Sequence, residues 1–466
     1  MTLLMMVSCT YNDISGSPEP DASASTAVTF RTYIGNGETR ATYPADAGGN
    51  GIVGTIDNDR LKETAFGVFA QHAGNTVWSS YGKSVPFNFM WNQQVTWDTE
   101  NGVWTYAPVK YWPNDNQPAD LNGATGSQAH SYLNFFAYAP YQKETTPASG
   151  FDVNTDSNSD GKPDHDGIVQ VTANSANVSA SYIYYRTSNT KPFDVDESVD
   201  LLWATQRDLW KTKDSGEGYV DGQVGLSFKH ALAKLEIKVR ALIDQTGTYT
   251  SPAYSTIVNE NSKIFVDEVW VTTPPYYSEG KLMLAPDSET PTWDYTNLSA
   301  YRKDGFHFDS TTDNGVDDVS YSIRWNGNPD DRSTPEEAAD DFDALTPGVT
   351  SDEELQLPAN YPMFMFPPTT TRNDITVRAK YYVVTYDPQL TLNNPRYYSI
   401  VENDITASLG NSDFQFEPNK QYKILLNLGL TSVKFDVYVL DDSGEYILLS
   451  AVVKEWDLKT IEVDVE

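Results

Sequence analysis

One segment of the chain has the residue types and spacing of a calcium-binding loop. Between residues 152 and 167, aspartate and asparagine recur at short intervals, and Ca²⁺ takes about six to eight oxygen ligands of this kind. The candidate ligands are Asp156, Asn158, Asp160, the main-chain carbonyl of Lys162, and Asp164. The twelfth position, where a calcium loop places a bidentate acid, is Gly167, and Asp166 lies one residue short. The pattern predicts either a calcium site or a solvated loop rich in Asx turns.

The single cysteine, Cys9, stands where a bacterial lipoprotein is acylated. An apolar start, Met1–Val7, leads through a small residue to this thiol. Signal sequences also have a charged region before the apolar run, whereas neither Lys nor Arg precedes Cys9. We therefore predict that residues 1–9 are the remnant of a longer signal that ends at an acylated cysteine, for example a palmitoylated one. The alternative is a chance apolar start with a free thiol. One cysteine forms no disulfide within the chain.

The charge balance excludes several classes of partner. The 466 residues include 65 Asp and Glu against 32 Lys and Arg, which gives a formal net charge of −33. Such a chain is repelled by the phosphate backbone of nucleic acids and by anionic membrane surfaces. The excess of acid is typical of a protein that stays dispersed on a crowded surface. We expect no nucleic-acid partner.

The sequence lacks the motifs that are typical of enzymes. The five histidines form no His-Glu-x-x-His pair, and neither a Gly-x-Ser-x-Gly elbow nor a phosphate-binding loop occurs. Paired carboxylates hydrolyse glycosides, but 65 acidic residues make such pairs uninformative. The sequence therefore predicts no catalytic residues and no required cofactor.

Five of the 11 tryptophans lie close together in the sequence. They are Trp78, Trp91, Trp97, Trp104 and Trp112. Indole faces stack on sugar rings, but they also fill β-sandwich cores and form cross-strand pairs. We favour the core, and we keep a monomeric, cell-surface glycan-binding lipoprotein as the alternative function.

Short strands are the elements expected to position these residues. Runs of β-branched and aromatic residues, often alternating and bounded by Gly, Pro, Asn or Asp, recur from residue 28 to residue 439. Residues 97–104 predict a hairpin with Asn101-Gly102 in its turn. A capping box at residues 334–337 predicts a short helix that ends near Leu345. Few helices among many strands indicate an all-β protein built from β-sandwiches.

The length of the chain and a polar segment predict two domains. Residues 211–223 are polar and contain Gly, which places a boundary between domains 27–222 and 223–466. Residues 10–26 are rich in Ser, Pro, Asp and Ala and lack apolar periodicity. We expect them to form a flexible tether between the lipid anchor and the folded part.

Several segments carry a resemblance that spans most of the chain. They are Tyr111–Pro113, Leu133–Pro140, Asp200–Ala204, Phe228–Val239 and Tyr422–Thr431. Together they resemble the fimbrillin family of Bacteroidales, in particular its Mfa-like fimbrial subunits. The resemblance implies two tandem transthyretin-like β-sandwich domains with few short helices. It also implies export to the outer membrane as a lipoprotein and assembly into a type V pilus.

The resemblance further implies maturation by proteolysis. Stalk members of the family lose their first strand after a cut behind an arginine, and a neighbouring subunit then donates a strand to the open groove. Here we expect the first strand at Val28–Ile34, and the polar loop after it contains the candidate cut, Arg40-Ala41. Arg31 is a second candidate for the site of the cut, but it lies within the strand. The alternative is that Arg40 is an ordinary loop residue.

The C-terminal end provides a candidate donor strand. Ile461, Val463 and Val465 alternate with acidic residues, which gives one apolar face and one polar face. This strand either is donated to a neighbouring subunit or closes its own sheet. Few residues follow Trp456, so stalk, tip, anchor and accessory roles all stay open.

The sequence as a whole predicts a fimbrial subunit or a fimbria-associated adhesin. We expect it at the cell surface, anchored in the outer membrane through Cys9. The expected partners are other fimbrial subunits and a receptor or glycan on a host or bacterial surface.

Overall fold

The computed structural model describes a chain that is almost entirely β. The described residues are 27–34, 56–80, 82–113, 131–142, 167–174, 176–186, 199–210, 222–241, 261–277, 279–298, 302–309, 333–344, 355–357, 363–365, 375–392, 396–408, 416–429, 432–440 and 446–455. The helices are α1 (Asn58–Thr64) and α3 (Pro335–Ala344), with short 3₁₀ turns η1 (Gly82–Ser84) and η4 (Val178–Ala180). Among these residues no helix is long and apolar enough to cross a membrane.

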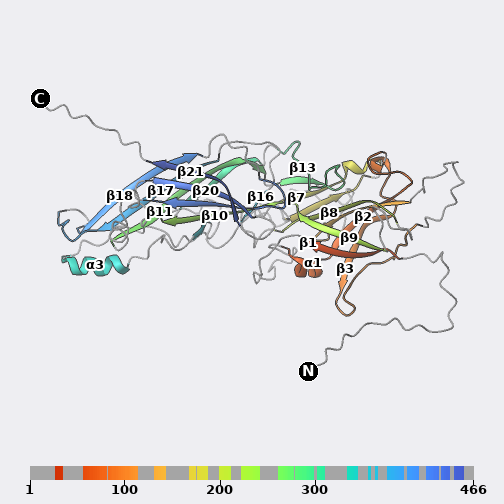
Figure 1. The fold of residues 1–466 in the computed structure, drawn as a ribbon, viewed down its shortest axis with the longest axis horizontal. Coiled ribbons are helices and arrows are strands. Elements are labelled where there is room, and N and C mark those ends of the chain that lie inside the picture. The colour runs from red at the N-terminus through yellow and green to blue at the C-terminus, as the bar shows by residue number, and fades with distance from the viewer. Residues whose placement is uncertain are drawn as a thin grey trace, which may run out of the picture.

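The strands fall into four sheets. Their bounds are β1 (Thr29–Ile34), β2 (Phe66–Gly74), β3 (Met90–Asp98), β4 (Val103–Thr105), β5 (Tyr132–Ala139), β6 (Gly167–Thr172), β7 (Tyr182–Arg186), β8 (Leu202–Leu209), β9 (Gln223–His230), β10 (Ala233–Ala241), β11 (Ser262–Tyr277), β12 (Glu279–Met283), β13 (Trp293–Asp294), β14 (Arg302–Asp309), β15 (Leu355–Leu357), β16 (Met363–Met365), β17 (Thr376–Tyr386), β18 (Tyr398–Ser408), β19 (Gln421–Leu428), β20 (Ser432–Leu440) and β21 (Tyr446–Glu455). Figure 1 shows two sets of sheets that lie end to end along the long axis. The predicted all-β class with few short helices is confirmed.

The first set pairs a seven-stranded sheet with a four-stranded one. The larger sheet has the order β1-β9-β8-β5-β2-β3-β4, and the smaller has β13-β12-β7-β6. Strand β5 is apolar on both faces because both are covered: Phe136 lies in the core between the two sheets, and Phe135 lies in a second core on the opposite face. Burial on both faces explains why β5 is nearly continuous in apolar residues and does not alternate.

The second set is also a sandwich. A six-stranded sheet contains β15, β10, β19, β20 and β21 in that order, with β16 also paired to β10. The facing sheet has the order β14-β11-β17-β18. Alternate apolar residues of both sheets, such as Leu235, Val269, Val377 and Leu426, form one buried core. Helix α3 packs on the outer face of the smaller sheet through Ala338 and Phe342, at the far left end of the molecule (Figure 1).

The strands before and after residue 222, where the sequence predicts a domain boundary, belong to the same sheet. Strand β9 pairs with β1 and β8, and β10, which follows it, pairs with β19. The apolar run from 226 to 239 therefore serves two sheets, with buried Ala231 and Leu232 at the crossing. Strand β12 returns from the second half of the chain to pair with β7. The domains 27–222 and 223–466 stay a prediction.

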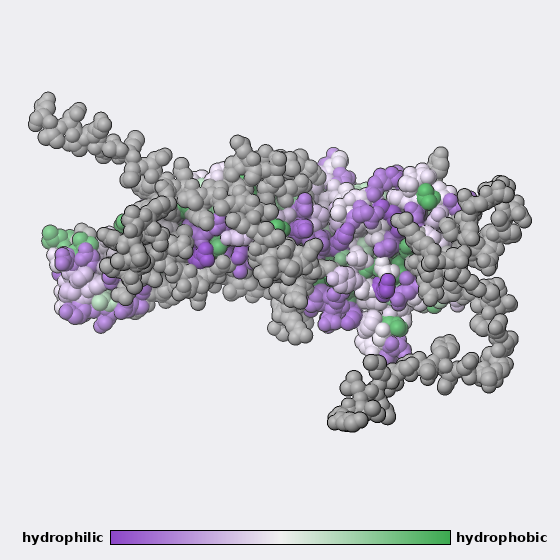
Figure 2. All heavy atoms as spheres, viewed as in Figure 1, coloured by the Kyte–Doolittle hydropathy of each residue, from purple (hydrophilic) through white to green (hydrophobic). Residues whose placement is uncertain are grey.

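The predicted hairpin and the predicted helix cap are both present, and in each a side chain accepts hydrogen bonds from nearby main-chain N–H groups. Asp98 accepts hydrogen bonds from the main-chain N–H groups of Glu100 and Asn101 in the β3–β4 hairpin, and Gly102 has a positive φ of 68° there. At α3, the Glu337 N–H donates to Thr334 Oγ1, which is the predicted cap. Among the coloured residues on the visible face in Figure 2, most are hydrophilic, and hydrophobic ones are scattered between them.

Candidate functional site: the first strand and its groove

The first strand, β1, lies at the edge of the seven-stranded sheet and has one strand neighbour within the described residues. It pairs in parallel with β9, from Thr29 opposite Gln223 to Ile34 opposite Phe228. The side chains alternate between outside and inside, and Phe30 and Ile34 are each 3% exposed. The first strand expected at 28–34 is present as Thr29–Ile34, one residue shorter at its start. One ladder of main-chain hydrogen bonds and one buried apolar face hold β1 in place.

Phe30 fills the centre of an aromatic pocket. Its ring centroid lies 5.9 Å from that of Phe66, 5.6 Å from that of Tyr106 and 6.0 Å from that of Phe135. The contacts to Phe66 and Phe135 are edge-to-face, which is a favourable arrangement for aromatic rings. The pocket is therefore shaped for a large aromatic side chain on β1.

Three side chains, from β4 with the residue that follows it and from α1, bind the open edge of β1. The Trp104 indole N–H donates to Thr32 Oγ1 at 3.1 Å, and the Tyr106 hydroxyl donates to the Val28 carbonyl at 2.8 Å. Burial raises the pKa of the Tyr106 phenol, so its hydroxyl keeps the proton that it donates. Asn58 accepts from the Ile34 N–H at 2.9 Å and donates to the Ile34 carbonyl. These links join β1 to β4 and α1.

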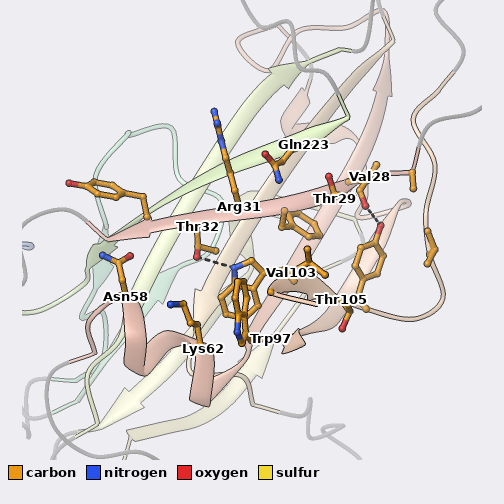
Figure 3. Close-up of a pocket in the computed structure, with 17 residues that line it drawn as sticks. Val28, Thr29, Arg31, Thr32, Asn58, Lys62, Trp97, Val103, Thr105 and Gln223 are labelled. Carbon is orange, nitrogen blue, oxygen red and sulfur yellow. Dashed lines mark hydrogen bonds between the residues drawn. The ribbon is translucent and has the colours of Figure 1, made fainter. Parts of the chain in front are cut away.

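A groove of about 730 Å³ runs along this edge, between β1 and the β3–β4 hairpin. In Figure 3, Lys62 and Trp97 lie on one side of β1, and Arg31 and Gln223 lie on the other. The Lys62 ammonium is 5.3 Å from the Trp97 ring centroid and 2.9 Å from Asp59. The groove is thus mainly aromatic and aliphatic, with cationic groups at its sides.

Helix α1 supplies one wall of the groove, although no helix was expected at these residues. Asp57 caps the helix by accepting from the N–H groups of Asp59 and Arg60. Leu61 is fully buried beneath it. The Asp57-Asn58 pair before a lone apolar residue was the available signal, but seven residues are too few for a periodic pattern.

The tryptophans divide between the core and the surface. Trp78, Trp104 and Trp112 are buried, which confirms the core interpretation for these three. Trp97 is half-buried in the groove. Trp91 is 44% exposed.

The other predicted site residues lie outside the described residues. They are Cys9, Arg40, Ala41, Asp156, Asn158, Asp160, Lys162, Asp164, Ile461, Val463 and Val465. The lipid anchor, the cut, the calcium loop and the donor strand therefore stay predictions. In the part of the chain that is described, no group of three His, Cys, Asp or Glu residues could hold a metal ion.

A buried aspartate, Asp200, pairs with His230 at the end of β9. His230 Nδ1 lies 2.7 Å from Asp200 Oδ2, which also accepts from the Ile56 N–H at 2.9 Å. The main-chain N–H of His230 donates to Oδ1 of the Asn419 side chain. This arrangement ties the end of β9 to the turn before β19 and gives His230 a structural role.

Comparison with known proteins gives one curated relative. No family model matches the chain. The fimbrium subunit Fim1C of Phocaeicola vulgatus is 24% identical over 287 residues, which are 59% of this chain and 61% of that protein. The match therefore spans less than two thirds of the relative's length. The predicted resemblance to Bacteroidales fimbrial subunits is confirmed by this relative.

Solved structures with loose similarity include two fimbrial proteins. A fimbrial protein from Bacteroides vulgatus has a TM-score of 0.42 at 17% identity, over 92% of this chain and 99% of that one. The fimbrial anchor protein Mfa2 from Porphyromonas gingivalis has a TM-score of 0.26 at 9% identity, over 92% of this chain and 98% of that one. Superpositions of this quality do not relate individual residues.

Proposed function

We propose that this protein is a fimbrial subunit of the cell surface that joins other fimbrial subunits by exchange of its first strand. The observation that carries the proposal is the position of β1, an edge strand that has one strand neighbour in the described part of the chain and buries its apolar side chains. The name of the curated relative supports the fimbrial role. The role is structural or adhesive, and none of its steps needs catalysis by this chain.

The geometry of β1 explains why its loss would drive assembly. Removal of the strand would leave the N–H and C=O groups along that edge of β9 without their partners. It would also empty the sites of Val28, Phe30 and Ile34, and burial of such side chains is worth about 1.5–3 kcal/mol each. A donated strand restores both the ladder and the apolar contacts. Head-to-tail repetition of that contact gives a filament.

The order of the predicted sites along the chain fits this maturation. The lipid anchor at Cys9 precedes β1, and the cut at Arg40-Ala41 follows it. One cut therefore separates both the outer-membrane anchor and β1 from the remainder of the chain. Since β1 is held by non-covalent contacts alone after the cut, a competing strand can replace it.

The remaining predicted parts belong to the same proposal. The alternating segment at Ile461, Val463 and Val465 is the candidate donor, and closure of its own sheet is the alternative. The loop at residues 156–164 is a candidate calcium site that would stiffen the chain without entering assembly. A tip or adhesin role would add a surface receptor or glycan as a partner.

The test uses the full chain with Cys9→Ser, treated briefly with an arginine-specific protease. We expect a new N-terminus at Ala41 and an SDS-resistant ladder on a non-boiled gel. Arg40→Gln should abolish both, and Arg396→Gln should behave as the parent. Clean trimming to monomers would assign a tip, anchor or accessory role. The absence of any discrete cut would contradict the maturation step and favour a monomeric glycan-binding protein.

A further inference from the structure

The free edge of β1 has main-chain groups that find no partner among the described residues. Thr29 donates its N–H to the Gly222 carbonyl on the β9 side, whereas Val28 and Ile34 direct their main-chain groups to the opposite edge. Alternate residues of a strand point their N–H and C=O groups to the same side. Phe30 and Thr32 therefore point theirs into the groove. Within the described residues, the main-chain N–H and C=O groups of Phe30 and Thr32 have no hydrogen-bond partner on that edge.

Exposed apolar side chains gather at the same place. Tyr33, Val103 and Val109 line the groove and are 59%, 48% and 47% exposed. They are three of the seven large hydrophobic residues that are exposed in the described part of the chain. Such a concentration beside an open strand edge is typical of an interaction site.

A cationic side chain lies beside the groove, although the chain as a whole is strongly acidic. Arg31 is exposed on the outer side of β1, above Gly225 of β9, and it makes no ion pair with a described residue. Lys62 borders the groove on its other side (Figure 3), where Asp59 pairs with its ammonium group. A strand added beside β1 would place its outward side chains next to Arg31. An acidic residue there would complete a cross-strand ion pair.

We propose that the groove between β1 and β4 binds an extended segment of a partner polypeptide in which apolar residues alternate with acidic ones. The segment adds a strand to the free edge of β1 and turns its apolar side chains toward Trp104 and its acidic ones toward Arg31. This binding takes place with β1 seated and requires no cut. It is therefore a second interaction, distinct from the exchange of β1.

The main-chain pattern favours a polypeptide over a glycan. Two residues at a spacing of two present both a donor and an acceptor along one line, which is the repeat of a β ladder. A saccharide could stack on Trp97 but would not match that repeat. This chain's own sequence Ile461-Glu462-Val463-Asp464-Val465-Glu466 has the required alternation, so a synthetic peptide of this sequence is a suitable probe.

The experiment uses the full, uncut chain with Cys9→Ser and the labelled peptide. Binding is followed by fluorescence anisotropy, and amide exchange by mass spectrometry over residues 28–34. We expect saturable binding with slowed exchange in that segment. A scrambled peptide of the same composition should not bind. Equal binding of the scrambled peptide, or no binding of either one, would overturn the proposal.

Backbone methylation of the peptide tests the ladder directly. In one peptide the N–H groups of the apolar residues are methylated, and in the other those of the acidic residues. Because only alternate residues face β1, one peptide should bind at least about tenfold more weakly and the other should bind as before. Equal affinities for the two peptides would rule out pairing with β1.

Two pairs of protein variants complete the test. Thr32→Pro removes the N–H that faces the groove and spares the β9 ladder, so it should bind about fivefold more weakly than Thr32→Ala. Arg31→Glu should weaken binding by about fivefold, and Lys420→Glu, with the same charge change on the second sandwich, should not. Thermal unfolding checks that each variant is folded. If an acidic oligosaccharide slowed amide exchange over residues 28–34 and the peptide did not bind, the groove would be a glycan site instead.

Discussion

The indole N–H of Trp104 donates a hydrogen bond to the Thr32 hydroxyl at 3.1 Å, across the gap between the two outermost strands of one sheet. Trp104 is 7% exposed and packs on Phe66, with their ring centroids 4.8 Å apart. The sheet thus curls until its first and last strands in the order, β1 and β4, are joined by side chains. This contact couples the seat of the first strand to the β3–β4 hairpin.

Loss of the Thr32 hydroxyl should destabilise this junction. Thr32→Val leaves the buried Trp104 N–H without an acceptor, so we expect the free energy of unfolding to fall by about 1–2 kcal/mol. Thr32→Ser keeps the acceptor and should lose much less. Equilibrium urea unfolding measures both. A Thr32→Val loss that persists unchanged in a Trp104→Phe background would show that the hydrogen bond is not its cause.

Truncation of Phe30 should have a larger effect. Phe30→Ala empties a pocket between Phe66, Tyr106 and Phe135, and buried Phe→Ala changes cost about 3–5 kcal/mol. Tyr33→Ala on the same strand, where the side chain is 59% exposed, should change stability by less than about 0.5 kcal/mol. Urea unfolding of the two variants compares them. Similar losses for both would contradict the assignment of the inner face.

The buried ion pair between β7 and β12 should be sensitive to the loss of one partner. Arg186 Nε lies 2.6 Å from Glu279 Oε1, and the side chains are 2% and 3% exposed. Glu279→Leu leaves a buried guanidinium without its partner and should cost about 3–5 kcal/mol. Arg186→Met combined with Glu279→Leu should recover most of this loss. Lys83→Met, at the exposed pair with Asp287, should cost less than about 1 kcal/mol in the same unfolding experiment.

Acid should selectively weaken the β3–β4 hairpin through Asp98. Hydrogen bonds from the Asn101 side chain and main chain hold the pKa of Asp98 below its usual value. A carboxyl with a lowered folded-state pKa stabilises the fold above its unfolded pKa, about 3.9, and loses that contribution as pH falls through the folded value. The difference in Tm between wild type and Asp98→Asn should therefore shrink toward zero in acid. Glu100→Gln on the same turn should show a much smaller pH-dependent difference, and an equal one would contradict the role of Asp98.

Local features of the fold could be predicted because their causes are local. The alternation along Thr29–Ile34, the Asn101-Gly102 turn and the cap at Thr334 each depend on neighbours a few residues away. The groove could not be predicted in the same way. Its walls come from β1, α1 and the β3–β4 hairpin, and no periodicity in the sequence marks which strand edges will meet.

The sequence by itself determined that the chain forms many short strands, that β1 has one apolar face, and that the surface is acidic, because these properties follow from residue type and spacing. Only the tertiary structure decided that β1 pairs in parallel with β9, almost two hundred residues later, and that β12 returns to pair with β7. It also decided that the run from 226 to 239 is divided between two sheets. The physical reason is that strand pairing is selected by the packing of distant side chains, such as Phe30 against Phe135, and many edges of similar apolar character compete for each strand.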